Sequence, residues 1–383
     1  MNFELPEELK MLKEMLRRFV DTELIPIERE TLDGAELKPE SEKWLNEKAV
    51  ELGLWQFDVP EEHGGLGLGL LAKTVVWSEL NRSIALPTRL PEIFGGASPI
   101  LYSLNKKQQE NYLRPVLDGK KKTAFAQTES DAGSDPAAMR TFAKRDGDHY
   151  IINGSKQFIS NALGADFFQV IAVTDREKAA RGGISTFLID ADSTGVTLLR
   201  EQELITDDKP WEILFEDVCV PAENLVGNEG DGFKLAQGWI STGRIRHAAR
   251  GMGVISRCLE MATQYSNERV TFGEKLSERQ AVQWMLVDMY TNLHQLSLMV
   301  YHAASKYDRG EDIRNEAFMC KILGDTKSFE AADACMQIHG GLGLTKELPI
   351  ERFWRDQRSM IITEGPTEVL KMALARQVIA EYS

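Results

Sequence analysis

The chain has 383 residues, of which 43% are hydrophobic, and its formal net charge is -14 at pH 7. This length predicts two or three domains or subdomains, and the acidic balance argues against a general nucleic-acid-binding protein, because phosphate binding needs clustered Lys and Arg. The N-terminal stretch has no apolar signal region, and no window has the uninterrupted apolar length of a membrane span. We therefore expect a cytoplasmic protein without membrane insertion.

Helical apolar spacing dominates the first third of the chain, from Leu5 to about Leu117, with breaks at Pro26, Pro87 and Pro91. After the segment LDGKKKT the pattern changes to short β-rich runs between turn residues, such as HYIINGSKQFIS, FFQVIAVT and EILFEDVCVP. The pair NG at 153–154 predicts a hairpin turn in this region.

Helical periods return from Phe233 onward, over 234–268, 277–307, 311–339 and 366–381, which is enough for an antiparallel four-helix bundle. The order α, β, α predicts an α+β multidomain protein, with an all-α domain at 1–122, a β domain at 123–232 and a helical bundle at 233–383. Strands do not alternate regularly with helices, so a Rossmann domain is excluded as the main fold.

The hexapeptide HGGLGL occurs at 63–68 and again at 339–344. Residues 67–72 of the first copy and its flank fit the dinucleotide fingerprint G-x-G-x-x-A, which is meaningful only between a strand and a helix. Here it follows a helix exit and opens another helix, so we predict a structural turn. The flanks of the two copies differ, which argues against an internal repeat.

The sequence does not indicate a metal site or a set of disulfide bonds. The four cysteines are widely spaced and form no C-x-x-C pair, so we expect buried free thiols at Cys219, Cys258, Cys320 and Cys335. His294 and His302 share one predicted helix, but no third ligand lies nearby in sequence. We predict no metal site.

The segment ITEGPTEVLKMALAR places Glu364 directly before Gly365 and Pro366, at the start of an amphipathic helix. Proline suits the first helical turn, so Glu364 should lie outside the helix, with its carboxylate free to point into a cavity. The alternative is an acid that complements the helix dipole, and this window alone does not decide between them. Glu368 has the position of a capping-box acid.

Two further segments offer groups for a bound ligand. The loop in FAQTESDAGSDPAAMR is rich in hydroxyls and backbone N–H groups. In GSKQFISN, period-two alternation puts Phe158 and Ser160 on one face of a strand. An aromatic plane beside a hydroxyl suits a flat heterocycle, although Phe158 could equally be an ordinary core residue.

Together these segments resemble the acyl-CoA dehydrogenase family over essentially the whole chain, through TESDAGSD, INGSKQFISN, NERVTFGEKLSERQAVQ, MQIHGGLGL and TEGPTEV. The resemblance implies an N-terminal α domain, a β-barrel-like middle domain and a C-terminal four-helix bundle, with FAD held between the last two. It also implies a homotetramer that oxidises an acyl-CoA to a trans-2-enoyl-CoA in fatty acid β-oxidation and passes electrons to an electron-transfer flavoprotein.

The resemblance assigns roles to particular residues. Glu364 falls on the catalytic base, which removes the α proton while flavin N5 accepts the β hydride. The family's other base position, beside an arginine, is Gly243 here, next to Arg244, and offers no carboxylate. The implied FAD contacts are Phe125, Gln127, Thr128, Ser134, Phe158, Ser160, Arg269, Phe272, Gln280, Gln337, Ile338, Gly340, Gly341, Thr367 and Glu368. The implied substrate contacts are Ser134, Ser241, Arg244 and Gly365.

The chain also departs from the family pattern. Phe158 and Ser160 stand where Trp and Thr are common, and EGPTEV differs from the usual E-G-T-S-Q at Pro366 and Glu368. Alternatives on the same fold are an enoyl-CoA reductase, an acyl-CoA oxidase and a non-catalytic FAD-binding scaffold. The acyl chain is left open, because pocket depth depends on helices around residues 87–103.

Overall fold

The computed structural model describes residues 4–87 and 94–383. The chain divides into two compact units: unit 1 comprises Met1–Trp44, Gly67–Leu90 and Ser241–Ser383, and unit 2 comprises Leu45–Leu66 and Pro91–Ile240. The three domain boundaries expected from sequence stay a prediction. Part of the segment expected to shape the acyl pocket, residues 88–93, lies outside the described residues. Within the described part of the chain, no helix is long and apolar enough to cross a bilayer.

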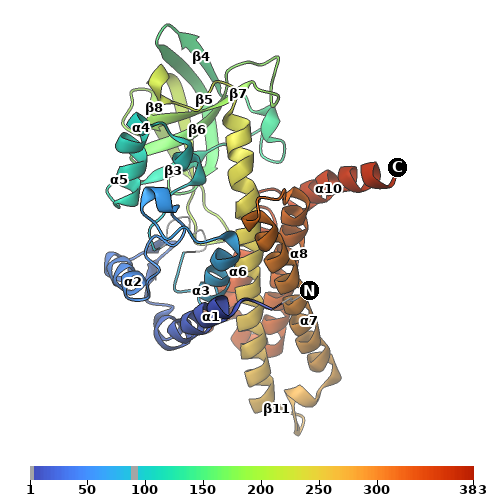
Figure 1. Ribbon diagram of the computed structural model, residues 1–383. Coiled ribbons are helices and arrows are strands. Elements are labelled where there is room, and N and C mark those ends of the chain that lie inside the picture. Colours follow the sequence, from blue (N-terminus) through green and yellow to red (C-terminus); the bar gives the residue numbers. More distant parts are fainter. Residues whose placement is uncertain (1–3, 88–93) are drawn as a thin grey trace. The chain divides into compact units, whose positions relative to one another are not determined.

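Unit 1 is built from helices, several of them long (Figure 1). They are α1 (Glu7–Phe19), α3 (Leu70–Leu80), α7 (Gln280–Asp308), α8 (Arg314–His339), α9 (Ile350–Met360), α10 (Thr367–Tyr382) and most of α6 (Gly232–Glu268). Helices α6, α7, α8 and α10 confirm the predicted C-terminal segments. The sequence analysis missed α9, because its sequence IERFWRDQRSM is largely polar and contributes only a narrow apolar stripe, including Ile350, Phe353 and Met360.

Glycines bring α6 and α8 into close contact in unit 1. A Cβ at Gly251 would come within 2.8 Å of the Gly324 carbonyl oxygen, and one at Gly324 would come within 2.6 Å of Ala248 Cα. Real Cβ atoms do not approach neighbours that closely, so larger residues would push the two helices apart. This spacing allows short polar side chains on α6 and α8 to meet.

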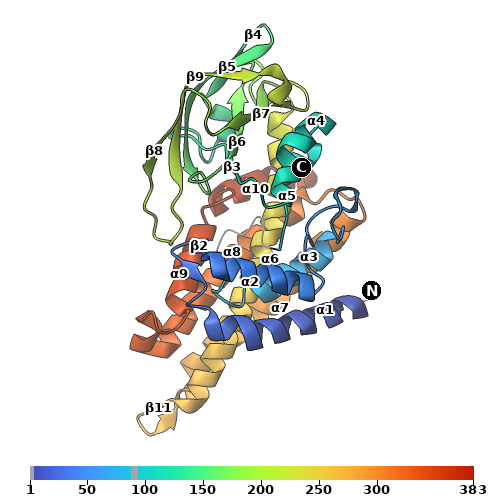
Figure 2. The same ribbon diagram turned by 90° about the vertical axis from the view of Figure 1, so that its left-hand side faces the viewer.

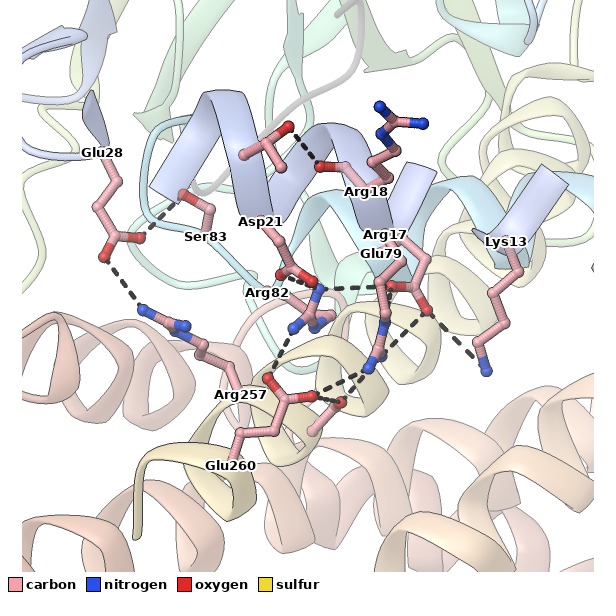
Figure 3. Close-up of polar contacts among 12 residues, drawn as sticks. Lys13, Arg17, Arg18, Asp21, Glu28, Glu79, Arg82, Ser83, Arg257 and Glu260 are labelled. Atoms are coloured by element: carbon pink, nitrogen blue, oxygen red, sulfur yellow. Dashed lines mark hydrogen bonds and ion pairs between the residues drawn. The ribbon is translucent and has the colours of Figure 1, made fainter. Parts of the chain in front are cut away.

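A buried charge network connects α1, α3 and α6 within unit 1 (Figure 3). The side chains of Glu79 on α3 and of Arg82, just beyond the C-terminal end of α3, are each only 2% exposed. Arg17 Nε lies 3.0 Å from Glu79 Oε2, and Arg82 Nη2 lies 2.6 Å from Glu260 Oε2. Arg82 Nη1 also donates to Asp21 at 2.7 Å. Since buried ions are stable only when paired and hydrogen-bonded, these contacts fix how the three helices pack.

The described residues of unit 2 build an eight-stranded sheet with the order β10-β7-β6-β4-β5-β9-β8, in which β3 pairs in parallel with β6. Figure 2 shows its long curved strands. The strands are β3 (Thr123–Ala126), β4 (Phe142–Asp146), β5 (His149–Ile159), β6 (Phe167–Val173), β7 (Ile184–Asp190), β8 (Val196–Glu201), β9 (Trp211–Pro221) and β10 (Leu225–Val226). A hydrophobic core cluster joins Leu113 and Leu117 of the helical segment α4–α5 (Lys106–Leu117) to Phe167 and Leu188 of the sheet.

The hairpin predicted at 153–154 is wrong. The turn between β4 and β5 contains Gly147, whose φ is +62°, whereas Asn153 and Gly154 lie inside β5 at a register shift against β9. Gly154 has φ +148°, and a Cβ there would overlap Thr141 Oγ1. Asn153 instead uses its side chain to bind Asp217 on β9, at 3.0 Å. The pair therefore specifies a bulge, the other common use of glycine in strands.

Three of the four cysteines, Cys258, Cys320 and Cys335, are buried free thiols as predicted. Cys219 is exposed, which corrects the fourth assignment, because it lies on the outward-facing side of β9. His294 and His302 are both exposed on α7.

Replacing Glu79 with Gln should lower the free energy of unfolding by about 3–5 kcal/mol, because it leaves the buried guanidinium of Arg82 with less compensating charge. The control is Glu14→Gln on the exposed face of α1, which should change stability by less than about 0.5 kcal/mol. Urea unfolding of both variants measures the difference. Equal effects of the two substitutions would show that the network contributes no specific stability.

Candidate functional site

The turn between α9 and α10 presents Glu364 outside any helix, as the sequence predicted. Glu364 has φ +53° and Gly365 has φ +105°, and α10 begins at Thr367 after Pro366 as its N-cap. A left-handed conformation is uncommon for Glu and costs free energy that the surrounding contacts must offset. Pro366 offers no side-chain acceptor for a capping box, so the capping-box assignment of Glu368 is wrong; its side chain is exposed in the first turn.

The carboxylate of Glu364 lies against α6 instead of complementing α10. A Cβ at Gly243 would overlap Glu364 Oε2, so a larger residue there would displace the carboxylate from this position. Oε1 is 3.2 Å from Arg246 Nη2 and 3.4 Å from His247 Nε2. Positions i, i+3 and i+4 share one face of a helix, which explains why Gly243, Arg246 and His247 converge on one side chain.

The backbone of this turn is also fixed, because Arg244 Nε donates to the Glu364 carbonyl oxygen at 3.3 Å. The guanidinium of Arg244 lies over the ring of Phe318, 4.9 Å from its centroid. Glu364 Oε2 is buried and has no hydrogen-bond partner among the described residues. One carboxylate oxygen is therefore held and the other is free.

A second layer of charge lies behind His247. Its Nδ1 is 3.5 Å from Asp325 Oδ2 on α8, and Lys321 Nζ is 2.8 Å from the same oxygen. Lys321 also donates to the Met360 carbonyl oxygen at the end of α9, at 3.0 Å. All these side chains belong to unit 1.

The electrostatic environment keeps Glu364 ionised. Burial raises the pKa of Glu364, but His247, Arg246 and Lys321 together lower it by more, so the pKa lies well below its usual value. The side chain retains 26% of its accessible surface. A partly open, ionised carboxylate with one unpartnered oxygen can accept a proton from a ligand.

Unit 2 contains its own fixed loop, which follows β3. The Glu129 side chain accepts hydrogen bonds from the backbone N–H groups of Arg140 and Thr141 and from Lys156 Nζ, the last at 2.8 Å. Lys156 is fully buried and also donates to the Gln127 carbonyl oxygen at 2.9 Å. Burial lowers the pKa of Lys156 to about 8, against the opposing effect of Glu129.

Phe158 is 47% exposed, so the interpretation as an ordinary core residue is wrong. Its φ of +57° interrupts the extended strand, and strict alternation therefore does not relate it to Ser160, which lies just beyond β5. The Phe158 N–H donates to Gln202 Oε1 at 2.7 Å, and Ser160 Oγ donates to Asp208 Oδ2 at 2.9 Å. The result is an exposed aromatic ring held at a rigid position.

The two glycine hexapeptides have different structures. Before α3, the carboxylate of Asp308 accepts hydrogen bonds from the N–H groups of Leu70 and Leu71, at 2.6 and 3.0 Å. The helix N-terminus is thus capped by the chain's own anion, which confirms the structural turn. The second copy ends α8 and continues as a 3₁₀ turn, Gly340–Leu344, with His339 stacked on Tyr265.

Comparison with known proteins identifies the chain. Three family profiles match it: "Acyl-CoA dehydrogenase, N-terminal domain" over residues 6–120, the "middle domain" over 124–218 and the "C-terminal domain" over 230–379. The chain belongs to the acyl-CoA dehydrogenase family.

Relatives of this family of oxidoreductases span several activities. The chain is 35% identical to "(R)-benzylsuccinyl-CoA dehydrogenase" of Thauera aromatica, over 100% of this chain and 98% of that protein. It is also 35% identical to "Caffeyl-CoA reductase-Etf complex subunit CarC" of Acetobacterium woodii, over 97% and 98% of the two chains. The solved "FAD complex of PigA" superposes with a TM-score of 0.89 at 27% identity, covering 99% of both chains.

The acyl-CoA dehydrogenase family is known to bind FAD, and each unit carries polar atoms that suit such a ligand. Gln127 Oε1 in unit 2 and Thr367 Oγ1 in unit 1 are buried without a hydrogen-bond partner among the described residues. Both were predicted as FAD contacts. Buried polar atoms are normally satisfied, so these two fit an added ligand.

The other predicted contacts are distributed between the two units. Phe125, Thr128 and Ser134 lie with Gln127, Phe158 and Ser160 in unit 2, whereas Ser241, Arg244, Arg269, Phe272, Gln280, Gln337, Ile338, Gly340, Gly341, Gly365 and Glu368 lie in unit 1 with Glu364 and Thr367. Of the last group, Arg244 donates to the backbone of Glu364, and Gly365 follows Glu364 in the turn.

Sequence reasoning missed Arg246, His247, Lys321 and Asp325. Helical spacing from position 243 could have placed Arg246 and His247 on one face, but nothing local shows that this face meets the Glu364 turn. The Glu129–Lys156 pair was also missed, although both residues lie in the quoted motifs. A lone Lys inside an apolar strand is a usable signal, because it needs a buried partner.

Replacing Gly243 with Ala should displace the Glu364 carboxylate, because the new Cβ would occupy the place of Oε2. Gly238→Ala on the same helix is the matched control, since a Cβ there meets nothing within 4 Å. Both substitutions should improve helix propensity by about 1 kcal/mol. Crystal structures of the variants provide the measurement, and an unmoved carboxylate in the Gly243 variant would contradict the steric argument.

Proposed function

We propose that the protein catalyses FAD-dependent α,β-dehydrogenation of an acyl-CoA thioester to a trans-2-enoyl-CoA, with Glu364 as the base. The observation that carries this proposal is the geometry of Glu364, whose side chain is partly open and whose carboxylate is bound through only one of its two oxygens among the described residues. A structural ion pair would have no need of the free, buried Oε2. Family membership supplies the reaction class.

In this mechanism Glu364 Oε2 takes the proton from the α carbon. When bound, FAD supplies the acceptor for the hydride that leaves the β carbon. Arg246 and His247 hold Oε1, so the side chain is oriented before substrate arrives and needs little reorganisation. Gly243 provides the space in which Oε2 lies.

Glu364 is a weak base until substrate binds, because Arg246, His247 and Lys321 lower its pKa. A bound acyl group removes water from the Glu364 side chain, which is still 26% exposed, and this desolvation raises the pKa of its carboxyl group toward the working range. Hydrogen bonds from backbone N–H groups to the thioester carbonyl would acidify the α proton by stabilising enolate charge.

We assign the FAD contacts in unit 2 to Phe125, Gln127, Thr128, Ser134, Phe158 and Ser160. Phe158 offers an exposed aromatic face, and the buried Glu129–Lys156 pair holds the preceding loop rigid. Positioning a cofactor requires contacting residues that are themselves held in place by the residues behind them.

The natural electron acceptor is proposed to be an electron-transfer flavoprotein. The reductase direction is the second candidate, favoured by the 35% identity to a caffeyl-CoA reductase–Etf complex subunit. An oxidase would instead pass electrons to oxygen. Anaerobic reduction followed by reoxidation in air separates the dehydrogenase from the oxidase, and reduction of enoyl-CoA by the prereduced protein tests the reductase.

Glu364→Gln keeps the size of the side chain but removes its basicity. The purified variant should remain yellow and should show a perturbed flavin spectrum with acyl-CoA, whereas anaerobic flavin reduction should slow by roughly 10²- to 10⁴-fold. The control is Glu347→Gln, an exposed acid before α9. Near-normal reduction in the Glu364 variant would eliminate the base assignment, and a colourless wild-type protein that cannot be reconstituted would eliminate the flavoprotein.

The assembly is proposed to be a homotetramer. Helix α7 exposes Trp284, Val287 and Tyr290, which are 60%, 60% and 68% accessible. Phe272, in the turn between the short strands β11 (Val270–Thr271) and β12 (Glu274–Lys275), is 99% accessible. Apolar surface of this kind marks an interaction site. Phe272, Arg269 and Gln280 lack an FAD partner within their own chain in the family fold, so a second copy would complete the cofactor site.

Val287→Asp should therefore dissociate the tetramer, because it places a charge in an apolar interface. Val50→Asp on α2 (Pro39–Glu51) is the matched control, since Val50 is 63% accessible outside this surface. Size-exclusion chromatography with light scattering should find four copies of the 43.1 kDa chain in wild type and control. A monomeric wild type that keeps FAD would refute the assembly.

A further inference from the structure

Arg246 has more hydrogen-bond donors than the structure uses. A guanidinium carries five N–H donors, yet the described residues provide Arg246 with one acceptor, Glu364 Oε1. Its Nε is buried and has no partner among the described residues, and the side chain as a whole is 16% exposed. A polar group left in this state is costly unless a ligand completes it.

The charges around Glu364 are also unbalanced. Lys321 is matched by Asp325, at 2.8 Å. The Glu364 carboxylate faces the guanidinium of Arg246 and the imidazole of His247, and the guanidinium of Arg244 donates to the backbone carbonyl oxygen of the same residue. Even with the imidazole neutral, the surroundings hold one more cation than anion, and an excess of partly buried positive charge favours an anionic ligand.

Resting on the proposed function, we propose that Arg246 determines substrate specificity by binding an anionic group on the acyl chain, so that the preferred substrates are acyl-CoA thioesters of dicarboxylic acids. A carboxylate matches the planar fork of a guanidinium, which binds it through two parallel hydrogen bonds. A plain alkyl chain offers no acceptor and would leave the Arg246 donors unpaired.

The position of Arg246 limits where the anion can lie. The α carbon must come within about 3–3.5 Å of the base for proton transfer, and Arg246 Nη2 is 3.2 Å from the other oxygen of the same carboxylate. The guanidinium is thus a few carbon–carbon bonds from the reacting centre. Acyl groups of about four to six carbons with a terminal carboxylate span this distance.

Substrate binding would then activate the base. The groups that face Glu364 are Arg244, Arg246 and His247 from α6, with Lys321 and Asp325 of α8 behind them. A substrate carboxylate competes with Oε1 for Arg246 and neutralises part of the charge that lowers the pKa of Glu364. A neutral acyl chain leaves Arg246 on Glu364 and leaves the carboxylate a weaker base.

The test compares hexanoyl-CoA with adipyl-CoA, which have the same chain length and differ by the terminal carboxylate. Anaerobic stopped-flow flavin reduction gives the rate constant and the dissociation constant for each. In wild type, the rate constant of flavin reduction divided by the dissociation constant should be at least about 10-fold larger for adipyl-CoA than for hexanoyl-CoA. Arg246→Met should slow flavin reduction by both thioesters, because Arg246 also orients Glu364, but the loss should be about 10- to 100-fold larger for adipyl-CoA than for hexanoyl-CoA. Arg246→Lys should restore part of the preference for adipyl-CoA.

Lys234→Met is the charge-matched control, because Lys234 is exposed on α6 without contact to Glu364. It should leave both substrates unchanged, which excludes a long-range charge effect. Equal use of the two substrates by wild type would overturn the proposal. So would an equal loss for both substrates in the Arg246→Met variant, since Arg246 would then only orient Glu364.

A failure of the proposed function gives a different result, in which neither thioester reduces the flavin. Calorimetric binding of the corresponding products then decides the Arg246 proposal, because oxidised enzyme does not convert them. 2,3-Dehydroadipyl-CoA should bind about 10-fold more tightly than 2-hexenoyl-CoA, and Arg246→Met should abolish the difference. Equal affinities in wild type would overturn it.

Discussion

The contact between the Glu364 carboxylate and Gly243 is the constraint on which the candidate site depends. Glu364 lies in a turn in the left-handed conformation, and a Cβ at Gly243 on the facing helix would displace its Oε2. The same helical face then brings Arg246 and His247 to the other oxygen. The glycine-mediated approach of α6 and α8 lets Asp325 reach His247 from behind. A wider helix spacing would separate these groups.

The site combines two opposed electrostatic requirements. An ionised carboxylate in a partly buried position needs neighbouring groups that favour its charge, which Arg246, His247 and Lys321 supply. A base for a C–H bond needs a higher proton affinity than those cations allow. Substrate binding can resolve the conflict by desolvation and by competition for Arg246. In unit 2 the Glu129–Lys156 pair has no such conflict, since it is nearly fully buried and serves only to hold the loop after β3.

Local sequence was enough to predict most helices, the β region and the position of Glu364 outside a helix. Apolar periodicity identifies α6, α7, α8 and α10, although only Thr367 and Leu370 of α10 are buried. The largely polar α9 has too narrow an apolar stripe to be recognised in the same way. Pro366 restricts the backbone of its own residue and the one before it, so the start of α10 follows from sequence alone. The family motifs identified the catalytic candidate for the same reason: they lie in short, continuous segments.

Tertiary structure alone decided which side chains surround Glu364. Arg246 and His247 are more than a hundred positions away in sequence, and their contact with the turn depends on how α6 packs against α8. Tertiary structure also decided that Asn153 and Gly154 form a bulge and not the hairpin turn predicted from sequence, because Thr141 fills the space that a Cβ at Gly154 would need. Sequence determines the local conformations that are open to a segment, whereas the pairing of charges and the fit of a glycine depend on atoms brought together only by folding.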